Sequence, residues 1–139
     1  MDIKMDVAEL NNFVQKVFPQ VCHQLHVEEV TEDGCIIRWK VDGSNIRPGG
    51  TISGPTMFSA ADVAAYLATL SRIGPEVLAV TTSCSIDFMR KPAANVDILA
   101  DCRLLKLGRV LSVSDVLIYS EGEPKPVARA SLTYSIPPK

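Results

Sequence analysis

Residues 53–75 read SGPTMFSAADVAAYLATLSRIGP, and this stretch decides how the rest of the chain must fold. It opens with Ser-Gly-Pro, in which the serine is suited to cap a helix and the proline to occupy its first turn, and it closes with Gly-Pro, a helix stop. Asp62 is the only charged residue before the arginine near its end. A helix that is apolar on nearly all sides must be wrapped by other protein. The stretch therefore predicts a buried central helix over about residues 55–72.

Patterns on either side predict one more helix and six strands. Apolar residues at helical spacing indicate an amphipathic helix over about residues 6–18. Two β-rich runs, residues 26–31 and 35–41, flank Asp33-Gly34, which is a strong hairpin signal. Four further strands are expected at residues 77–89, 96–107, 110–119 and 126–136. The expected fold class is α+β, a strongly curved antiparallel sheet around one buried helix, with edges that commonly pair with a second subunit.

Composition narrows the possible functions. The chain has 139 residues, the size of one ordinary domain, and 47% of them are hydrophobic, enough for a real core. Its formal net charge of -2 gives no basic surplus for a nucleic acid or an anionic membrane. The four cysteines form no CxxC pair, so no zinc motif is present. The start, MDIKMDVAEL, is not a signal peptide, and the apolar stretch is too broken for a membrane span, so a cytoplasmic location is expected.

Gly54 and Asp62 together suggest a chemistry. A helix N-terminus presents unpaired N–H groups and a partial positive charge, and Gly54 lets a ligand atom approach closely, which suits a developing oxyanion. About two turns further along, Asp62 is placed to act as a general base or to attack an acyl group itself. The alternative is that Asp62 pairs with a buried arginine or caps a neighbouring segment, and its position alone does not separate these readings.

Four stretches resemble the motifs of one protein family. They are RPGGTISGPTMFSAADVAAY (residues 47–66), SIDFMRKP (85–92), LGR (107–109) and PVARASLTY (126–134). In their order and spacing they resemble hotdog-fold thioesterases of the phenylacetate-pathway (PaaI-type) family. The resemblance covers roughly residues 30–136. It implies a single hotdog thioesterase domain over residues 1–139 and an acyl-CoA substrate.

The resemblance also implies roles for individual residues. Asp62 matches the family's catalytic carboxylate, which acts as a base toward water or as a nucleophile, and Gly54 matches the glycine whose N–H polarises the thioester carbonyl. Thr81, or with less support Thr82, falls where some members place a hydroxyl that orients water from the partner subunit. The family typically forms homodimers, often paired into tetramers, with active sites at the subunit interface. It needs no metal, and no cofactor is expected.

Three positions depart from the family motif. Ser53 stands where the family has His, and Pro55 stands where it has a second Gly. Arg47 stands where members often carry Asn or Gln that contacts the catalytic water or the acyl carbonyl. Ser53, Pro55 and Arg47 are therefore candidate substrate-binding residues, and Arg47 is also a candidate to form an ion pair with Asp62.

Further candidates come from the chemistry of CoA, whose phosphates suit cationic side chains. Arg90, Lys91, Lys106 and Arg109 lie near strand ends or turns, and for each of them the alternative is a solvated surface charge. Phe58 and Tyr66 lie one turn from Asp62 on either side and are candidates to line an acyl pocket, although core packing is the commoner role of such residues.

Hydrolysis of an acyl-CoA to a free acid and CoA is the function that these expectations favour. A non-catalytic acyl-CoA-binding protein on the same fold is the first alternative, motivated by Ser53 and Arg47. A hotdog dehydratase is the second, and the absence of a histidine near the central helix argues against it. No GxSxG, P-loop or GxGxxG motif is present, which argues against a serine hydrolase, a P-loop nucleotide enzyme and a Rossmann dehydrogenase.

Overall fold

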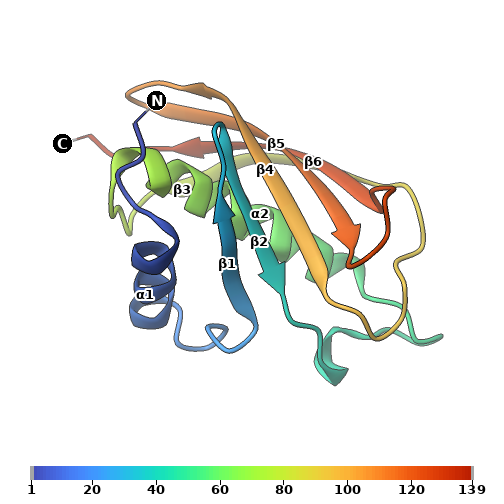
Figure 1. The fold of residues 1–139 in the computed structure, drawn as a ribbon. Coiled ribbons are helices and arrows are strands. Elements are labelled where there is room, and N and C mark those ends of the chain that lie inside the picture. The colour runs from blue at the N-terminus through green and yellow to red at the C-terminus, as the bar shows by residue number, and fades with distance from the viewer. Residues whose placement is uncertain (1, 139) are drawn as a thin grey trace.

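A single antiparallel sheet curves around one long helix, as Figure 1 shows. The computed structural model describes residues 2–138. The six strands lie in the order β1-β2-β4-β5-β6-β3, and the expected α+β class is confirmed. In chain order the elements are α1 (Val7–Val17), β1 (Leu25–Val30), β2 (Gly34–Trp39), the short 3-10 helix η1 (Gly43–Asn45), α2 (Gly54–Ile73), β3 (Val80–Phe88), β4 (Ile98–Leu107), β5 (Leu111–Ser120) and β6 (Ala128–Ser135).

The ends of α2 lie within one residue of their predicted places. Ser53 is the N-cap, and its Oγ accepts a hydrogen bond from the Thr56 N–H at 3.3 Å. Gly74 ends the helix with φ +91°, a conformation that favours glycine, and its N–H donates to the Leu70 carbonyl at 2.9 Å. Local sequence signals therefore determine both ends of this helix.

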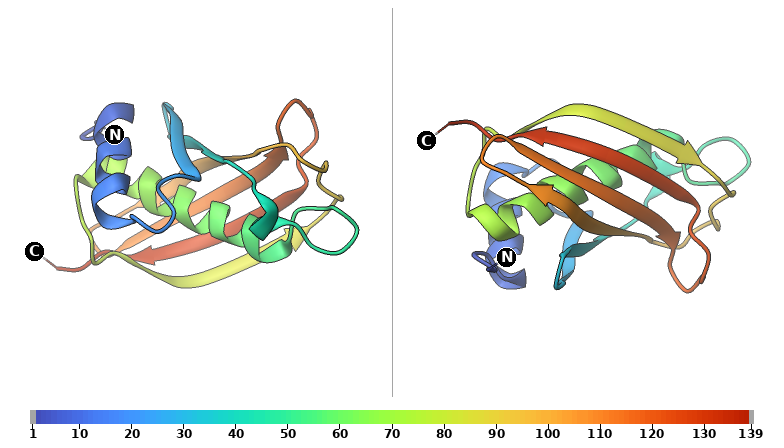
Figure 2. Two further views of the ribbon diagram at one scale, coloured as in Figure 1. Left: turned by 90° about the horizontal axis from the view of Figure 1, so that it is seen from below. Right: turned by 90° about the horizontal axis from the view of Figure 1, so that it is seen from above.

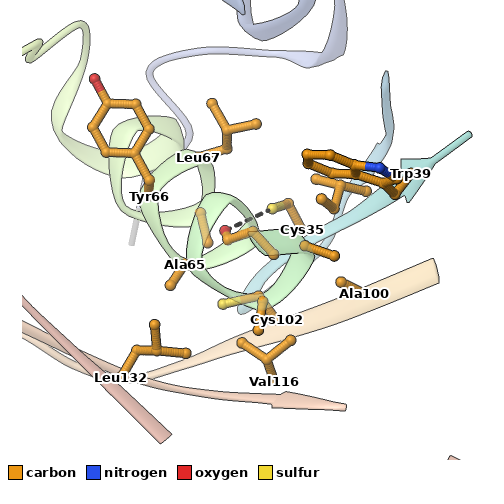
Figure 3. Close-up of a cluster of buried hydrophobic side chains, with 14 of the residues drawn as sticks. Cys35, Trp39, Ala65, Tyr66, Leu67, Ala100, Cys102, Val116 and Leu132 are labelled. Atoms are coloured by element: carbon orange, nitrogen blue, oxygen red, sulfur yellow. Dashed lines mark hydrogen bonds between the residues drawn. The ribbon is translucent and has the colours of Figure 1, made fainter. Parts of the chain in front are cut away.

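Small side chains allow the sheet to close around α2. Both views in Figure 2 show the helix along the concave side of the sheet, between the edge strands β1 and β3. Figure 3 shows the same packing in detail, where Ala65 of the helix lies near the cysteines of β2 and β4. The helix buries five alanines completely or almost so: Ala60, Ala61, Ala64, Ala65 and Ala68. Because an alanine projects only a methyl group, the strands approach the helix backbone closely.

The inward face of β5 changes from polar to apolar along the strand. Ser112 and Ser114 are buried at its first inward positions, followed by Val116 and Ile118, whereas Leu111 and Leu117 are exposed on the outer face of the sheet. The buried Ser112 hydroxyl has a partner on α2. Ser112 Oγ lies 2.7 Å from Thr69 Oγ1 of α2, which satisfies both groups.

The predicted hairpin is present, but Gly34 is needed for a different reason from the one expected. It is the first residue of β2 rather than part of the turn, and its φ is not positive. A Cβ built at Gly34 would lie 1.8 Å from the backbone oxygen of Cys102 on β4. The glycine is therefore required by the close contact between two strands.

β3 lies at one edge of the sheet and pairs only with β6 within residues 2–138. It begins three residues later than predicted, because residues 74–79 form the loop that returns from the end of α2. Large apolar side chains are exposed along this strand and its flanks: Val77, Leu78, Val80, Phe88 and Met89. An edge strand with such a surface is a ready site for pairing with another chain.

No helix in residues 2–138 is both long and apolar enough to cross a membrane. The feature that comes nearest, α2, is surrounded by the sheet along most of its length.

Replacing Gly34 by alanine tests the close contact between β2 and β4. The new methyl group meets backbone, which cannot move aside cheaply, so we expect Gly34→Ala to lower the free energy of unfolding by about 3 kcal/mol or more. Urea denaturation measures this change. Gly43→Ala is the matched control, since nothing lies within 4 Å of its added Cβ, and it should change stability by less than about 0.5 kcal/mol. Equal effects of the two substitutions would contradict the proposed reason for Gly34.

Candidate active site

One stripe along α2 is left uncovered by the sheet. The residues of its first turns that are not buried are spaced four apart, so they share one side of the helix: Gly54 and Pro55, Phe58 and Ser59, Asp62 and Val63. The next positions of the stripe are closed, because Tyr66 is buried against Phe13 and Phe18 of the N-terminal region. Asp62 is thus the only charged residue on the accessible side of this part of the helix.

Two hydroxyl groups hold the Asp62 carboxylate. Thr81 donates to Asp62 Oδ1 at 2.6 Å, and Tyr134 donates to the same oxygen at 2.8 Å. The Tyr134 hydroxyl also lies 2.9 Å from the Asp62 backbone carbonyl. Within residues 2–138 no group donates to Asp62 Oδ2. One carboxylate oxygen is therefore occupied and the other is left for a ligand or for water.

Asp62 does not pair with an arginine in the described part of the chain. The alternative that Arg47 forms an ion pair with Asp62 is wrong, since Arg47 lies in the loop before α2 and lines a cleft near Gly54. The alternative of a buried arginine is wrong as well. Arg72 is the buried arginine, and it donates to Ser71 Oγ and to carbonyls of the β1–β2 hairpin.

Thr81 reaches Asp62 from the same chain. It lies at the start of β3, paired across strands with Tyr134 of β6, so both hydroxyls point to the same side of the sheet. A bulge follows Thr81 and separates it from Thr82, whose hydroxyl instead donates to the Thr133 carbonyl at 3.3 Å. Of the two threonines proposed from the sequence, Thr81 is the one beside Asp62.

Cys84 is the next residue of β3 on this side of the sheet. Its thiol is partly buried, and burial together with the negative charge of Asp62 raises the pKa of Cys84. The thiol is therefore largely protonated at neutral pH. Its titration provides a probe of the charge on Asp62.

The N-terminus of α2 offers a free backbone donor. Ser53 Oγ is occupied with Thr56, at 2.7 Å from its hydroxyl, so this side chain serves the helix cap. In the described part of the chain the Gly54 N–H has no acceptor. A Cβ at Gly54 would lie 3.3 Å from the Phe88 ring, which packs closely over the glycine. A cleft of about 710 Å³ opens beside Gly54 and Phe88.

Three of the five predicted cations gather at this cleft. Arg47, Arg90 and Lys91 line it. Lys106 and Arg109 lie instead near the β4–β5 turn, at the opposite end of the sheet, because the end of β3 is aligned with the start of β4. Within a single chain, Arg90 and Lys91 are thus the two of the four candidate CoA contacts that lie near Gly54, and Lys106 and Arg109 lie away from it.

The remaining candidates divide between surface and core. Pro55 and Phe58 are exposed on the open stripe of α2. Tyr66 is buried, and its hydroxyl donates to the Glu76 carbonyl at 3.0 Å. In Figure 3 it points away from the buried cysteines Cys35 and Cys102. Tyr66 contacts the Asp62 environment only through the ring of Tyr134, with the ring centroids 5.8 Å apart.

Residues 2–138 contain no cluster of three or more His, Cys, Asp or Glu side chains that could hold a metal ion. A hollow of about 400 Å³ lies on the outer face of the sheet, lined by charged residues such as Asp101, Asp115 and Arg129. None of the predicted site residues lines it. The donor at Gly54 and the carboxylate of Asp62 are therefore the groups that offer chemistry for an acyl carbonyl.

These two groups are too far apart to act on one carbonyl within a single chain. They are eight residues apart on the same helix, which places them roughly 12 Å apart along its axis. A carbonyl carbon under attack and its own oxygen are about 1.2 Å apart. The Asp62 side chain therefore cannot directly attack a carbonyl that is held at the Gly54 N–H of its own chain.

Comparison with known proteins supplies the family. Residues 49–127, more than half of the sequence, match the family model of the thioesterase superfamily. The chain belongs to the thioesterase superfamily. The matched range contains Gly54, Asp62 and Thr81, whereas Tyr134 lies beyond it. A comparison with curated proteins finds no match.

Solved structures agree with this membership. A protein of Silicibacter sp. TM1040, named as a candidate thioesterase, is 46% identical, with 99% of this chain and 96% of that chain covered and a TM-score of 0.93. The phenylacetic acid degradation protein PaaI of Thermus thermophilus, in a mutant form, is 25% identical, with 91% and 99% covered and a TM-score of 0.70. A Streptococcus mutans protein bound to acetyl-CoA is 23% identical, with 83% and 90% covered and a TM-score of 0.71. The hotdog fold is confirmed, and the PaaI-type resemblance is confirmed at the level of the superfamily.

Sequence reasoning missed two residues of this thioesterase-superfamily site, Tyr134 and Phe88. Both lie on the helix-facing side of their strands, at the two ends of the accessible stripe. Tyr134 follows Ala128, Ala130 and Leu132 at alternate positions, which indicates an inward direction. A tyrosine on a core-facing position needs a partner for its hydroxyl, and this requirement is a usable signal.

Alkylation of Cys84 tests the placement of Asp62. Since the charge of Asp62 contributes to the raised thiol pKa, Asp62→Asn should lower that pKa and increase the thiolate fraction. We expect iodoacetamide to modify Cys84 about twofold faster at pH 8 in the variant, because burial, the larger cause, is unchanged. Mass spectrometry follows the reaction residue by residue. Cys22, also partly exposed, is the internal control, and an unchanged Cys84 rate would contradict the geometry.

Proposed function

We propose that this chain is an acyl-CoA thioesterase, which hydrolyses an acyl-CoA to a free carboxylic acid and CoA. The observation that carries the proposal is the accessible Asp62 carboxylate, with Oδ1 held by two hydroxyls and Oδ2 left without a donor in residues 2–138. A charge in an apolar helix is costly unless it has a function, and it is here oriented without being neutralised by a cation. Membership of the thioesterase superfamily supports the same reaction class.

In the proposed reaction the thioester carbonyl oxygen accepts a hydrogen bond from the Gly54 N–H. The helix N-terminus stabilises the negative charge that develops on this oxygen. Asp62 Oδ2 either takes a proton from an attacking water or attacks the carbonyl carbon itself, and both routes use the same free oxygen. On the base route, the oxygen of the deprotonated water bonds to the carbonyl carbon, the C–S bond breaks, the thiolate of CoA leaves and takes up the proton, and the acyl group leaves as the acid. On the nucleophile route, the C–S bond breaks to leave the acyl group bonded to Asp62 as an anhydride, and a water molecule then hydrolyses this anhydride to the free acid and the Asp62 carboxylate.

A second copy of the chain completes the site in this proposal. Since Gly54 and Asp62 of one chain are roughly 12 Å apart along α2, the donor and the carboxylate that act on one thioester come from two chains. If two α2 helices run antiparallel along their open stripes, the N-terminus of each lies beside Asp62 of the other. The exposed apolar residues of the β3 edge provide a surface for this pairing. A homodimer is thus the minimal unit proposed, and pairing of dimers into tetramers is compatible with it.

CoA is the proposed carrier of the acyl group. Arg47, Arg90 and Lys91 line the cleft beside Gly54, where they can bind the phosphates of a ligand whose thioester lies at the helix N-terminus. The Streptococcus mutans relative binds acetyl-CoA, which supports this choice of ligand class. The 25% identity to PaaI supports a PaaI-type member, with an aromatic or medium-length acyl group as the substrate class to test first.

A non-catalytic acyl-CoA-binding protein is the second candidate. The observation that favours it is the capping role of Ser53, because no side chain at this position is free to assist the carbonyl. A dehydratase is less well supported. Both histidines, His23 and His26, are exposed and lie outside the Asp62 environment.

Turnover of a panel of acyl-CoAs tests the proposal directly. The wild type should release free thiol, measured with a chromogenic thiol reagent. Asp62→Asn should lower kcat by about a hundredfold or more, since the amide neither takes a proton nor attacks, while it retains the contacts of the side chain.

Calorimetric titration with the same acyl-CoAs separates the two candidates. Binding without release of thiol across the panel would favour the binding protein. Release of thiol at equal rates by the wild type and Asp62→Asn would show that the role given to Asp62 is wrong.

Mixed dimers test whether the site is shared between chains. Gly54→Pro removes the N–H, and Ser53 already has the extended conformation, φ -71° and ψ 151°, that is favoured before proline. Dimers of Gly54→Pro with Gly54→Pro, or of Asp62→Asn with Asp62→Asn, should be inactive. A dimer with one chain of each kind, isolated with two affinity tags, retains one complete site and should recover about half of the wild-type activity.

Gly54→Ala is the control for the mixed-dimer experiment. It adds the same Cβ against the Phe88 ring, which is the far end of a movable side chain, but it keeps the N–H. It should therefore lose far less activity than Gly54→Pro. Mixed dimers that are as inactive as both parents would contradict a shared site while leaving hydrolysis itself possible.

A further inference from the structure

Tyr134 has two contacts with Asp62 that fix the direction of its side chain. The hydroxyl lies 2.8 Å from Asp62 Oδ1 and 2.9 Å from the Asp62 backbone carbonyl. One hydroxyl proton is shared between two acceptors of the same residue, so the carboxylate is drawn toward its own backbone. From the geometry we infer that Tyr134 is a positioning residue, which sets the rotamer of Asp62 so that Oδ2 faces the open stripe of α2.

The sheet register explains why Tyr134 is so placed. Tyr134 of β6 is the cross-strand partner of Thr81 on β3 and of Ser112 on β5. The three residues form a row of hydroxyls across neighbouring strands, all directed at α2. Thr81 and Tyr134 bind Asp62, whereas Ser112 binds Thr69 two turns further along the helix. Two hydroxyls of the row, those of Thr81 and Tyr134, thus donate to Asp62 Oδ1. The third, that of Ser112, does not contact Asp62.

The ring of Tyr134 is held rigidly behind its hydroxyl. Only 5% of the residue is exposed, and the ring packs on Tyr66 with centroids 5.8 Å apart. Tyr66 in turn contacts Phe13 and Phe18, at 6.3 Å and 5.7 Å between centroids. A donor fixed in this way loses little entropy when it orients the carboxylate.

Tyr134 keeps its proton at neutral pH. Burial and the negative charge of Asp62 raise the pKa of Tyr134 well above its ordinary value. The hydroxyl therefore acts as a donor and not as a base. Cys84 of β3 is the other ionisable group whose titration senses Asp62, and Tyr66 is the ionisable group that faces Tyr134 from α2.

Steady-state kinetics of Tyr134→Phe test this role. The inference rests on the proposed thioesterase activity, so the kinetic test uses acyl-CoA hydrolysis by the wild-type dimer as reference. The variant keeps the ring and loses one hydrogen bond to a charged group, so kcat per folded protein should fall roughly tenfold, with KM within about twofold.

Ser112→Ala is the matched control. It removes a buried hydroxyl from the same row, directed at the same helix, that does not contact Asp62. A purely structural role of the row would make both variants lose stability, with kcat per folded protein unchanged in each. A fall of kcat at nearly unchanged KM that is confined to Tyr134→Phe supports the inference, and an unchanged kcat in folded Tyr134→Phe would overturn it.

Carbon-13 NMR tests the same contact without any turnover. The chain has three tyrosines, so protein labelled at tyrosine Cζ gives three signals, and the Tyr134 signal is the one absent from Tyr134→Phe. Asp62→Ala should shift that signal far more than the other two, because the hydrogen bond to a carboxylate is lost. An unmoved Tyr134 signal would overturn the inference. If the wild type hydrolyses no acyl-CoA, the proposed function fails, and the NMR result still decides the contact.

Discussion

The burial of α2 is the constraint on which the rest of the structure depends. A helix so rich in alanine can be covered only by strands that approach its backbone closely, and the strands therefore carry small residues on their inner face. The inward positions include Cys35, Ala100, Cys102, Ser112, Ser114, Ala128 and Ala130. The same demand accounts for the serines at the first inward positions of β5, Ser112 and Ser114. Coverage ends along a single stripe, and that stripe is where the candidate site lies.

Asp62 is a charged residue on a helix that is otherwise almost entirely apolar before its last turn. A carboxylate on a helix that is almost entirely buried is commonly paired with a cation, and such pairing holds the carboxylate but also neutralises it. Here the donors are the hydroxyls of Thr81 and Tyr134, which carry no charge, so Asp62 is oriented without a cation beside it. The cations of this region lie instead at the far end of the stripe, around the cleft beside Gly54. In the proposed function, the carboxylate acts on the thioester and the cations bind the phosphates of CoA.

Much of this arrangement was predictable, because it rests on local signals. The bounds of α2 and its burial follow from a stretch of about twenty residues with its own cap and stop, and the same stretch singles out Asp62 and Gly54 as candidates. The contact between Asp62 and Tyr134 was not predictable in the same way. The contact depends on the register of β6 against β3. A single sequence indicates which side chains of a strand face inward, but it does not indicate which residues of two distant strands are paired. The ion pair of Arg47 with Asp62 was wrong for a related reason, since the loop before α2 turns toward the helix N-terminus. The positions of Lys106 and Arg109, at the opposite end of the sheet from Arg90 and Lys91, likewise depend on how distant strands pair.

The aromatic contacts of Tyr66 give the N-terminal helix a significance beyond its own packing. The rings of Phe13 and Phe18 contact Tyr66. Tyr66 in turn contacts the ring of Tyr134, whose hydroxyl donates a hydrogen bond to Asp62. Phe13 and Phe18 therefore support Tyr134 from behind, through the ring of Tyr66. For anyone choosing boundaries for a minimal version of this fold, a chain that begins at β1 would retain every strand and the whole of α2. It would nevertheless expose one face of Tyr66, and the tyrosine behind the carboxylate would lose its support.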